Sequence, residues 1–176
     1  SARKVAELIG HDRVRAEQAG TAADSNIRVG VGYATFTEQT AHGCTEWASR
    51  GMPVVFAFET ARAKLDQSGG LSLEVGIQSH GQGLETTLAQ VASDELGIDP
   101  GDITVHHGDT GRTPYGMGTF ASRSMVMAGG AVQGASRQLA GRVKEVAAVM
   151  LGCSASDIRL AAGKAHGPQG GLTLRD

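Results

Sequence analysis

The spacing of hydrophobic residues divides the beginning of the chain into a helical part and an extended part. Within the range 3–18, apolar residues are interspersed with charged ones at helical intervals, which predicts one or two short amphipathic helices. A polar stretch that begins at Gly20 interrupts this pattern. In 27–36 apolar residues alternate with small or polar ones, as in a half-buried strand. We therefore expect an N-terminal helical segment over 1–26 and a domain over 27–176.

Two further apolar stretches predict a β-hairpin over 53–79. The first is the run 54–65, and the second alternates over 71–77. The residues between them, 66–70, are Asp, Gln, Ser, Gly and Gly, a composition typical of a turn.

Helical periodicity dominates the second half of the chain. In 84–96 apolar residues recur at intervals of three and four, and Gly97 is expected to end this helix. A strand is predicted over 103–107. The longest helical pattern follows over 125–150, with Ser124 or Ser122 as its capping residue.

An internal repeat supports these boundaries. The stretch 96–105 is matched by 151–160, and both give a helix end, a glycine, an acidic turn and a strand. The resulting order β-β-α-β-α-β favours an α+β fold of two layers, with two main helices on one face of a mixed β-sheet. The last residues, 167–174, predict either an edge hairpin or a frayed end.

Composition excludes several functional classes. With 16 basic and 18 acidic residues, a net charge of -2 argues against a nucleic-acid partner. No apolar run reaches the roughly 20 residues that cross a bilayer, and the first thirty residues lack the apolar middle of a signal peptide, so we expect no membrane partner and a cytoplasmic protein. Cys44 and Cys153 are expected to be two small buried thiols. The 26 glycines leave much backbone bare.

The first candidate site is the junction 78–87, where a predicted strand meets a predicted helix. The first amides of a helix lack intrahelical partners and lie at the positive end of its dipole, so they stabilise an anion such as phosphate. Gly81 and Gly83 remove the Cβ atoms that would keep a ligand from the backbone, and the Gln82 amide can donate and accept. Thr86 adds a hydroxyl. An ordinary strand-to-helix turn remains the alternative.

The second candidate site is the glycine-rich stretch 109–124, again between a strand and a helix. Ser122 and Ser124 supply hydroxyls, and Arg123 supplies a charge and a donor fork suited to phosphate. A plain surface loop remains the alternative here. Since both helices follow strands, both N-termini are expected to open on the same sheet edge. Neither stretch has a P-loop or a complete Gly-x-Gly-x-x-Gly motif, so ATP and NAD are disfavoured.

The six histidines do not form a metal motif in the sequence. His106 and His107 are adjacent in a predicted strand and are expected to point to opposite faces, so they would not chelate one ion. His80 alone stands near the proposed ligand, and a hydrogen-bonding role is favoured over metal ligation. No Ser-His-acid triad is assignable. Glu59 is predicted only as a polar contact.

Four ordered motifs resemble the large, molybdenum-binding subunit of the molybdenum hydroxylases, the xanthine dehydrogenase, aldehyde oxidase and carbon monoxide dehydrogenase family. They are the stretches 30–40, 81–90, 108–110 and 114–124. The resemblance is strongest to the bacterial carbon monoxide dehydrogenase-like and aldehyde dehydrogenase-like branch. It extends from the first predicted helix to about Leu160.

The resemblance implies that the two glycine junctions bind molybdopterin cytosine dinucleotide with its molybdenum. One binding segment would be Gly81, Gln82, Gly83 and Thr86, and the other Ala121, Ser122, Arg123 and Ser124. It further implies an oxidoreductase that takes oxygen from water and passes electrons to iron-sulfur clusters and FAD on other domains or subunits. The remaining part of the large subunit and the iron-sulfur and FAD subunits are the implied partners.

The chain departs from the family pattern because the substrate-side loop and the Gly-x-Gly-Glu segment with the general base are missing. We therefore expect these residues alone to be inactive, with no catalytic or metal-ligating residue assigned. Surfaces that would meet the missing domains are expected to favour self-association into a homo-oligomer. The alternatives are a non-catalytic nucleotide-binding or assembly module that kept the fold, and a zinc-dependent hydrolase that uses the histidines. The substrate is not identified by these residues.

Overall fold

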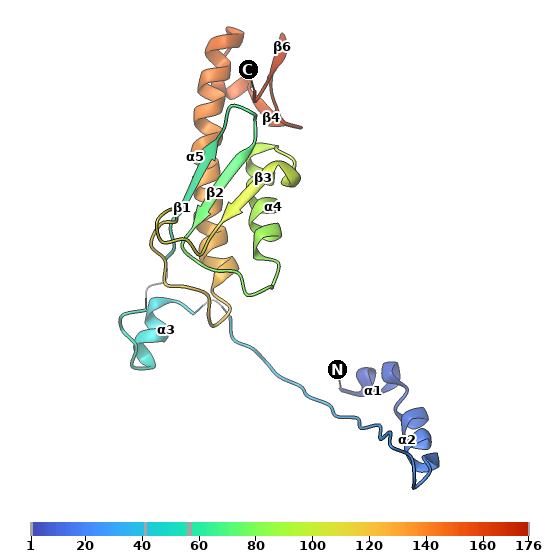
Figure 1. The fold of residues 1–176 in the computed structure, drawn as a ribbon. Helices are drawn as coiled ribbons and strands as arrows, with labels where there is room; N and C mark the ends of the chain where they lie inside the picture. Colours follow the sequence, from blue (N-terminus) through green and yellow to red (C-terminus); the bar gives the residue numbers. More distant parts are fainter. Residues whose placement is uncertain (1, 41, 56–57, 176) are drawn as a thin grey trace. The chain divides into compact units, whose positions relative to one another are not determined.

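The computed structural model describes residues 2–40, 42–55 and 58–175, which form two compact units, Ser1–Glu38 and Gln39–Asp176 (Figure 1). The first unit contains α1 (Ala2–Ile9) and α2 (His11–Gly20). Gly10 separates them with a left-handed backbone, φ 66°. Of the one or two short helices predicted over 3–18, two are present.

The strand predicted over 27–36 is wrong. No strand forms there, although the structure describes every residue of that range, and the Phe36 side chain is 84% exposed. The segment is tied instead to α2, because the Gln18 Nε2 atom donates to the Val29 carbonyl at 2.7 Å. Alternation shows that one face of a strand can be buried, but a strand also needs a hydrogen-bonded neighbour.

The second unit is built on a mixed sheet of three strands in the order β1-β2-β3. β1 (Ala61–Leu65) and β2 (Leu71–Val75) form the predicted hairpin, and β3 (Ile103–His106) lies parallel to β2. The first hairpin strand is shorter than predicted. Of the residues expected before Ala61, 54–55 and 58–60 are not strand, and 56–57 lie outside the described residues.

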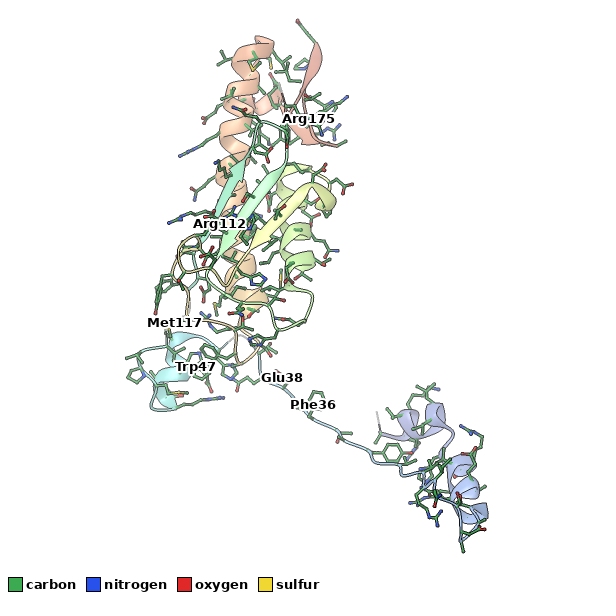
Figure 2. All side chains as sticks on the ribbon, viewed as in Figure 1. Phe36, Glu38, Trp47, Arg112, Met117 and Arg175 are labelled. Atoms are coloured by element: carbon green, nitrogen blue, oxygen red, sulfur yellow. The ribbon has the colours of Figure 1, made fainter. Side chains whose placement is uncertain are left out.

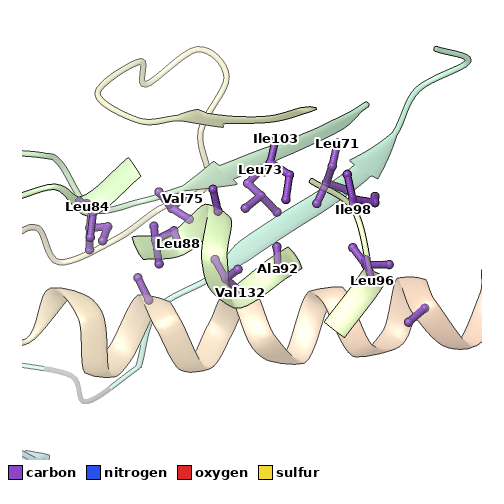
Figure 3. Packing of buried hydrophobic residues seen from close by; sticks show 14 residues of the cluster. Leu71, Leu73, Val75, Leu84, Leu88, Ala92, Leu96, Ile98, Ile103 and Val132 are labelled. Carbon is purple, nitrogen blue, oxygen red and sulfur yellow. The ribbon is translucent and has the colours of Figure 1, made fainter. Parts of the chain in front are cut away.

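Two helices cover one face of this sheet, as predicted. They are α4 (Leu84–Leu96) and α5 (Ser124–Leu151). Apolar side chains from β2, β3 and both helices meet in one layer between sheet and helices (Figure 3). Leu73, Leu88 and Val132 are fully buried there. The alternating strand pattern and the helical spacing therefore face each other across one core.

The repeated boundary signal is confirmed in detail. Gly97 and Gly152 end their helices in left-handed conformations, φ 67° and 64°. Each is followed by a short 3-10 turn, Pro100–Asp102 or Ala155–Asp157, and then by a strand. Glycine adopts this backbone without the steric penalty that a Cβ imposes.

The last predicted strand does not join the first sheet. It is β4 (Arg159–Ala161), which pairs with β5 (Lys164–Gly167) and β6 (Gly170–Thr173) in a second, antiparallel sheet. Because α5 has 28 residues, it is roughly 42 Å long and carries the chain beyond the short strands of the first sheet. The α+β class is thus confirmed, but with two sheets, and the C-terminal hairpin is formed.

Two smaller findings complete the fold. A short helix, α3 (Cys44–Ser49), precedes the first sheet. The prediction of buried thiols is wrong, since Cys44 is exposed and Cys153 is half-buried. Within the described residues, no helix is both long and apolar enough to cross a membrane.

Candidate functional site

The junction between β2 and α4 presents bare backbone to open space. Gly81 and Gly83 have φ 89° and 76°, and Gly83 is the residue that caps α4. A Cβ atom added at either glycine would meet no atom of the described chain within 4 Å. The Gln82 Oε1 atom accepts a hydrogen bond from the His80 backbone N–H at 2.5 Å, and Gln82 and Thr86 are exposed. The geometry therefore leaves room for a ligand against the start of α4.

The Glu85 carboxylate connects the residues of the same junction. The Ser79 hydroxyl donates to Glu85 Oε2 at 2.9 Å, and Glu85 Oε1 lies 2.9 Å from His107 Nε2. The Glu85 backbone N–H, and after it His107 and Ser79, hold the pKa of this carboxyl below its ordinary value. Glu85 thus ties the turn to the end of β3. It also places a negative charge beside the start of α4, so the surroundings of this helix start are not purely positive.

The junction before α5 contains a strained turn. Ala121 and Ser122 both have positive φ, 48° and 54°, a region that residues with a Cβ enter at a cost. Such backbone persists only when its surroundings fix it, and it is common at ligand sites. Its neighbours are indeed fixed, since the Ser124 hydroxyl donates to Thr119 Oγ1 at 2.9 Å and the Arg123 backbone N–H donates to the Phe120 carbonyl at 3.1 Å.

Arg123 lies inside the molecule rather than on its surface. Its side chain is 1% exposed and forms an ion pair with Glu59, whose side chain is fully buried. The guanidinium also donates to the Gly118 carbonyl at 2.8 Å and to the Phe58 carbonyl at 3.2 Å. Glu59 Oε1 additionally accepts the Met117 backbone N–H at 3.1 Å. The pair therefore pins both ends of the segment 117–123 from within.

Direct contacts bring the two junctions together. The Gln78 backbone N–H donates to Thr119 Oγ1 at 3.1 Å, and that hydroxyl donates to the Gln78 carbonyl at 2.5 Å. Behind them, the backbones of Gly76 and Gly116 touch, since a Cβ added at Gly76 would lie 2.6 Å from the Gly116 Cα. The starts of α4 and α5 therefore open on one edge of the first sheet.

The glycine-rich loop between β3 and α5 is anchored on the outer face of this sheet. Arg112, labelled in Figure 2, donates to Glu74 Oε1 at 3.1 Å and to the Ser72 hydroxyl at 3.2 Å. The hydrogen bond from Arg112, and after it one from Arg62, lowers the pKa of the Glu74 carboxyl. The loop is thus held to the strands at its middle as well as at its end.

Several residues of the site were not identified from the sequence. Glu59 was predicted only as a polar contact, and Thr119 and Gly76 were given no role. A carboxylate at the end of the apolar run 54–58 was the available signal for Glu59. For Gly76, the signal was a glycine inside an alternating strand pattern, which often marks a close backbone approach.

The histidines have separate surroundings. His107 contacts Glu85, whereas His106 is half-buried in β3 opposite Glu74. His80 lies in the turn before α4 and is exposed. The described residues contain no group of three or more His, Cys, Asp or Glu side chains arranged to hold a metal ion.

Comparison with known proteins identifies the family of the chain. The model of the molybdopterin cofactor-binding domain matches residues 4–176. The chain belongs to this family. The molybdopterin-binding domain is 35% identical over 158 residues to the carbon monoxide dehydrogenase large chain of Hydrogenophaga pseudoflava. This alignment covers 89% of the present chain and 19% of the relative. The domain is 39% identical over 132 residues to the nicotine 6-hydroxylase large subunit of Paenarthrobacter nicotinovorans, covering 75% and 16%.

A solved structure shows the same fold. Quinoline 2-oxidoreductase from Pseudomonas putida 86 superposes with a TM-score of 0.70 at 28% identity, covering 98% of the molybdopterin-binding domain and 22% of that chain. The domain spans about a fifth of the length of the curated relatives that it matches. The curated relatives are named as a dehydrogenase and a hydroxylase, and a further solved structure with this fold is named as a Cu,Mo-CO dehydrogenase. Together with the family model, these matches confirm the family resemblance.

Proposed function

We propose that the molybdopterin-binding domain holds the diphosphate of a molybdopterin dinucleotide between its two helix starts. The first binding segment is Gly81, Gln82, Gly83 and Thr86, and the second is Ala121, Ser122, Arg123 and Ser124. The family membership supports a molybdopterin cofactor. The cytosine dinucleotide form rests on the resemblance to the carbon monoxide dehydrogenase-like branch. When bound, the cofactor supplies the metal that exchanges oxygen and electrons with a substrate.

One observation carries the proposal. The open glycines of the first junction lie on the same sheet edge as the strained turn of the second, because Thr119 joins the two through Gln78. Successive backbone N–H groups in such turns form concave sites for anions. The residues present therefore fit a diphosphate, which needs several donors from more than one direction.

Arg123 contributes to this site in a different way from the one its sequence position suggested. Because the Arg123 guanidinium is already paired with the Glu59 carboxylate, we propose that Arg123 acts as a positioning residue for the turn at 121–122. The backbone amides and the Ser122 and Ser124 hydroxyls then meet the phosphates. A direct Arg123–phosphate contact stays a prediction.

At the level of the whole protein, we propose an oxidoreductase of the molybdenum hydroxylase type. The relatives' names describe large chains and subunits of complexes, which supports partner subunits. That these partners carry iron-sulfur clusters and FAD rests on the family resemblance alone. In this scheme the present residues bind and orient the cofactor, and the general base comes from a segment outside them. A non-catalytic nucleotide-binding module remains the second candidate, and retention of cofactor without turnover in the assembled enzyme would favour it.

The test is a titration of the purified chain with cytidine diphosphate, in which binding is measured by calorimetry and by the phosphorus NMR shift. We expect cytidine diphosphate to bind more tightly than cytidine. The substitution Gly83→Ala is expected to weaken the binding of cytidine diphosphate. Gly163→Ala is the matched control, since Gly163 has a similar φ of 68°, open surroundings and a place in the turn between β4 and β5, outside both binding segments. Equal affinity for cytidine and cytidine diphosphate, or equal losses in both variants, would refute the diphosphate site.

A further inference from the structure

An aromatic cluster outside the two binding segments packs against the strained turn. Trp47 of α3 contacts Phe120 edge to face, with ring centroids 5.5 Å apart and planes at 62°. His42 stacks on Trp47 at 5.1 Å and 29°. Phe120 in turn lies under the Arg123 guanidinium, 5.3 Å from its ring centroid. Figure 2 labels Trp47 on α3. The cluster thus reaches the residue that immediately precedes Ala121.

Two ring nitrogen atoms of the cluster lack hydrogen-bond partners among the described residues. Trp47 and His42 are each 6% exposed, yet Trp47 Nε1 and His42 Nδ1 are buried without a hydrogen-bond partner among the described residues. Buried polar atoms normally have partners. An arrangement that leaves two of them unpaired lowers stability, which is typical of positions that serve function.

A third contact to Trp47 comes from Arg50, the residue that caps the end of α3. The Arg50 guanidinium carbon lies 6.0 Å from the Trp47 ring centroid. Arg50 is itself fixed, because it donates to Glu46 Oε1 and to Gln39 Oε1, both at 2.8 Å. Trp47 therefore has a defined orientation before it meets Phe120.

We propose that Trp47, supported by His42, is a positioning residue that fixes Phe120 and thereby the left-handed turn at Ala121–Ser122. The inference rests on the proposed function for its consequence, since this turn is one half of the diphosphate site. Strained backbone persists only when the surrounding structure fixes it. Arg123 and Ser124 hold the turn on one side, and Phe120 holds it on the other.

The test measures hydrogen exchange at two amides of the purified chain by NMR. The Arg123 amide donates to the Phe120 carbonyl and reports opening of the turn, whereas the Cys153 amide donates to the Ala148 carbonyl at the far end of α5. In Trp47→Leu we expect exchange at Arg123 to rise about three- to tenfold, the value of one aromatic pair, with Cys153 unchanged. Trp47→Phe, which keeps an aromatic edge, is expected to restore protection.

The outcomes separate the inference from the proposed function. A rise of equal size at both amides, or no rise at Arg123, would overturn the positioning role. If the exchange result holds while the wild-type chain fails to bind cytidine diphosphate, the diphosphate site fails and the positioning of the turn stands. Where the positioning role and the diphosphate site both hold, Trp47→Leu is expected to weaken the affinity for cytidine diphosphate by the same three- to tenfold factor. Trp47→Phe is then expected to restore this affinity.

Discussion

Replacing Glu59 with glutamine tests whether a buried ion pair fixes the second binding segment. The side chains of Glu59 and Arg123 are 0% and 1% exposed. Glutamine keeps an oxygen for the Met117 N–H but removes the negative charge, so the guanidinium remains buried without compensation. Breaking a buried pair in this way costs about 3–5 kcal/mol of the free energy of unfolding. Since single domains are stable by only about 5–15 kcal/mol, the variant should fold but melt early.

The assay is urea unfolding followed by far-UV circular dichroism, which reports α4 and α5, together with thermal melting. A loss of this size corresponds to a melting temperature lower by roughly 10 °C for a domain of this length. Glu95→Gln is the matched control, because the Arg137–Glu95 pair is 2.9 Å long but its side chains are 62% and 21% exposed. Exposed pairs contribute about 0–1 kcal/mol.

A double variant separates charge from packing. Replacing Glu59 and Arg123 by leucine and methionine removes both charges at once, and such replacements are often neutral for stability. We expect it to be more stable than Glu59→Gln, yet weaker than the wild type in binding cytidine diphosphate, because Gly118 loses its donor. If Glu59→Gln costs less than about 1 kcal/mol, or the double variant is the less stable of the two, the pair is not the constraint described.

Three further predictions use paired positions. Gly97→Ala should cost more in urea unfolding than Gly152→Ala, because both are left-handed helix ends but only at Gly97 would a Cβ lie 2.6 Å from the backbone of β4; equal costs would contradict this. Gly116→Ala should destabilise, since its Cβ would overlap neighbouring backbone, whereas Gly134→Ala, in open space inside α5, should stabilise by about 0.5–1 kcal/mol in thermal melts. Because the pKa of Glu85 is lowered from 4.5, its contribution is present above that value and is lost as pH falls through the lower folded-state pKa. The gap in urea midpoint between wild type and Glu85→Gln should therefore narrow as the pH falls below 4.5, and a constant gap would refute it.

Local patterns were sufficient for the elements that make their own boundaries. The ends of α4 and α5 follow from long helical spacing closed by a glycine, and both ends lie where predicted. The extended segment 27–36 shows the limit of this reasoning. Its alternation shows that the segment could present one apolar and one polar face. Whether it forms a strand depends on a hydrogen-bonded neighbouring strand, which the local pattern does not reveal. The second sheet was missed for a similar reason, because its partners lie beyond the predicted last strand.

The site was predictable in part. The two strand-to-helix junctions follow from glycines next to helix starts, and the structure brings them to one edge. The burial of Arg123 was not predictable, since its partner Glu59 stands 64 residues earlier in a stretch that was expected to be strand. A charged side chain in a glycine-rich loop is usually solvated, and only a tertiary contact reverses that expectation.

Five glycines near the two junctions fall into two physical groups with different roles. At Gly76 and Gly116 a Cβ has no space, so these residues let two loops pack backbone against backbone. At Gly81, Gly83 and Gly118 the space is open and φ is positive, so no packing in the described chain demands a missing side chain. Close packing in the first group gives the second group a fixed place, and bare backbone that is both fixed and open is what an anionic ligand requires. A chain with only one of these groups would have either a rigid loop without room or an open loop without order.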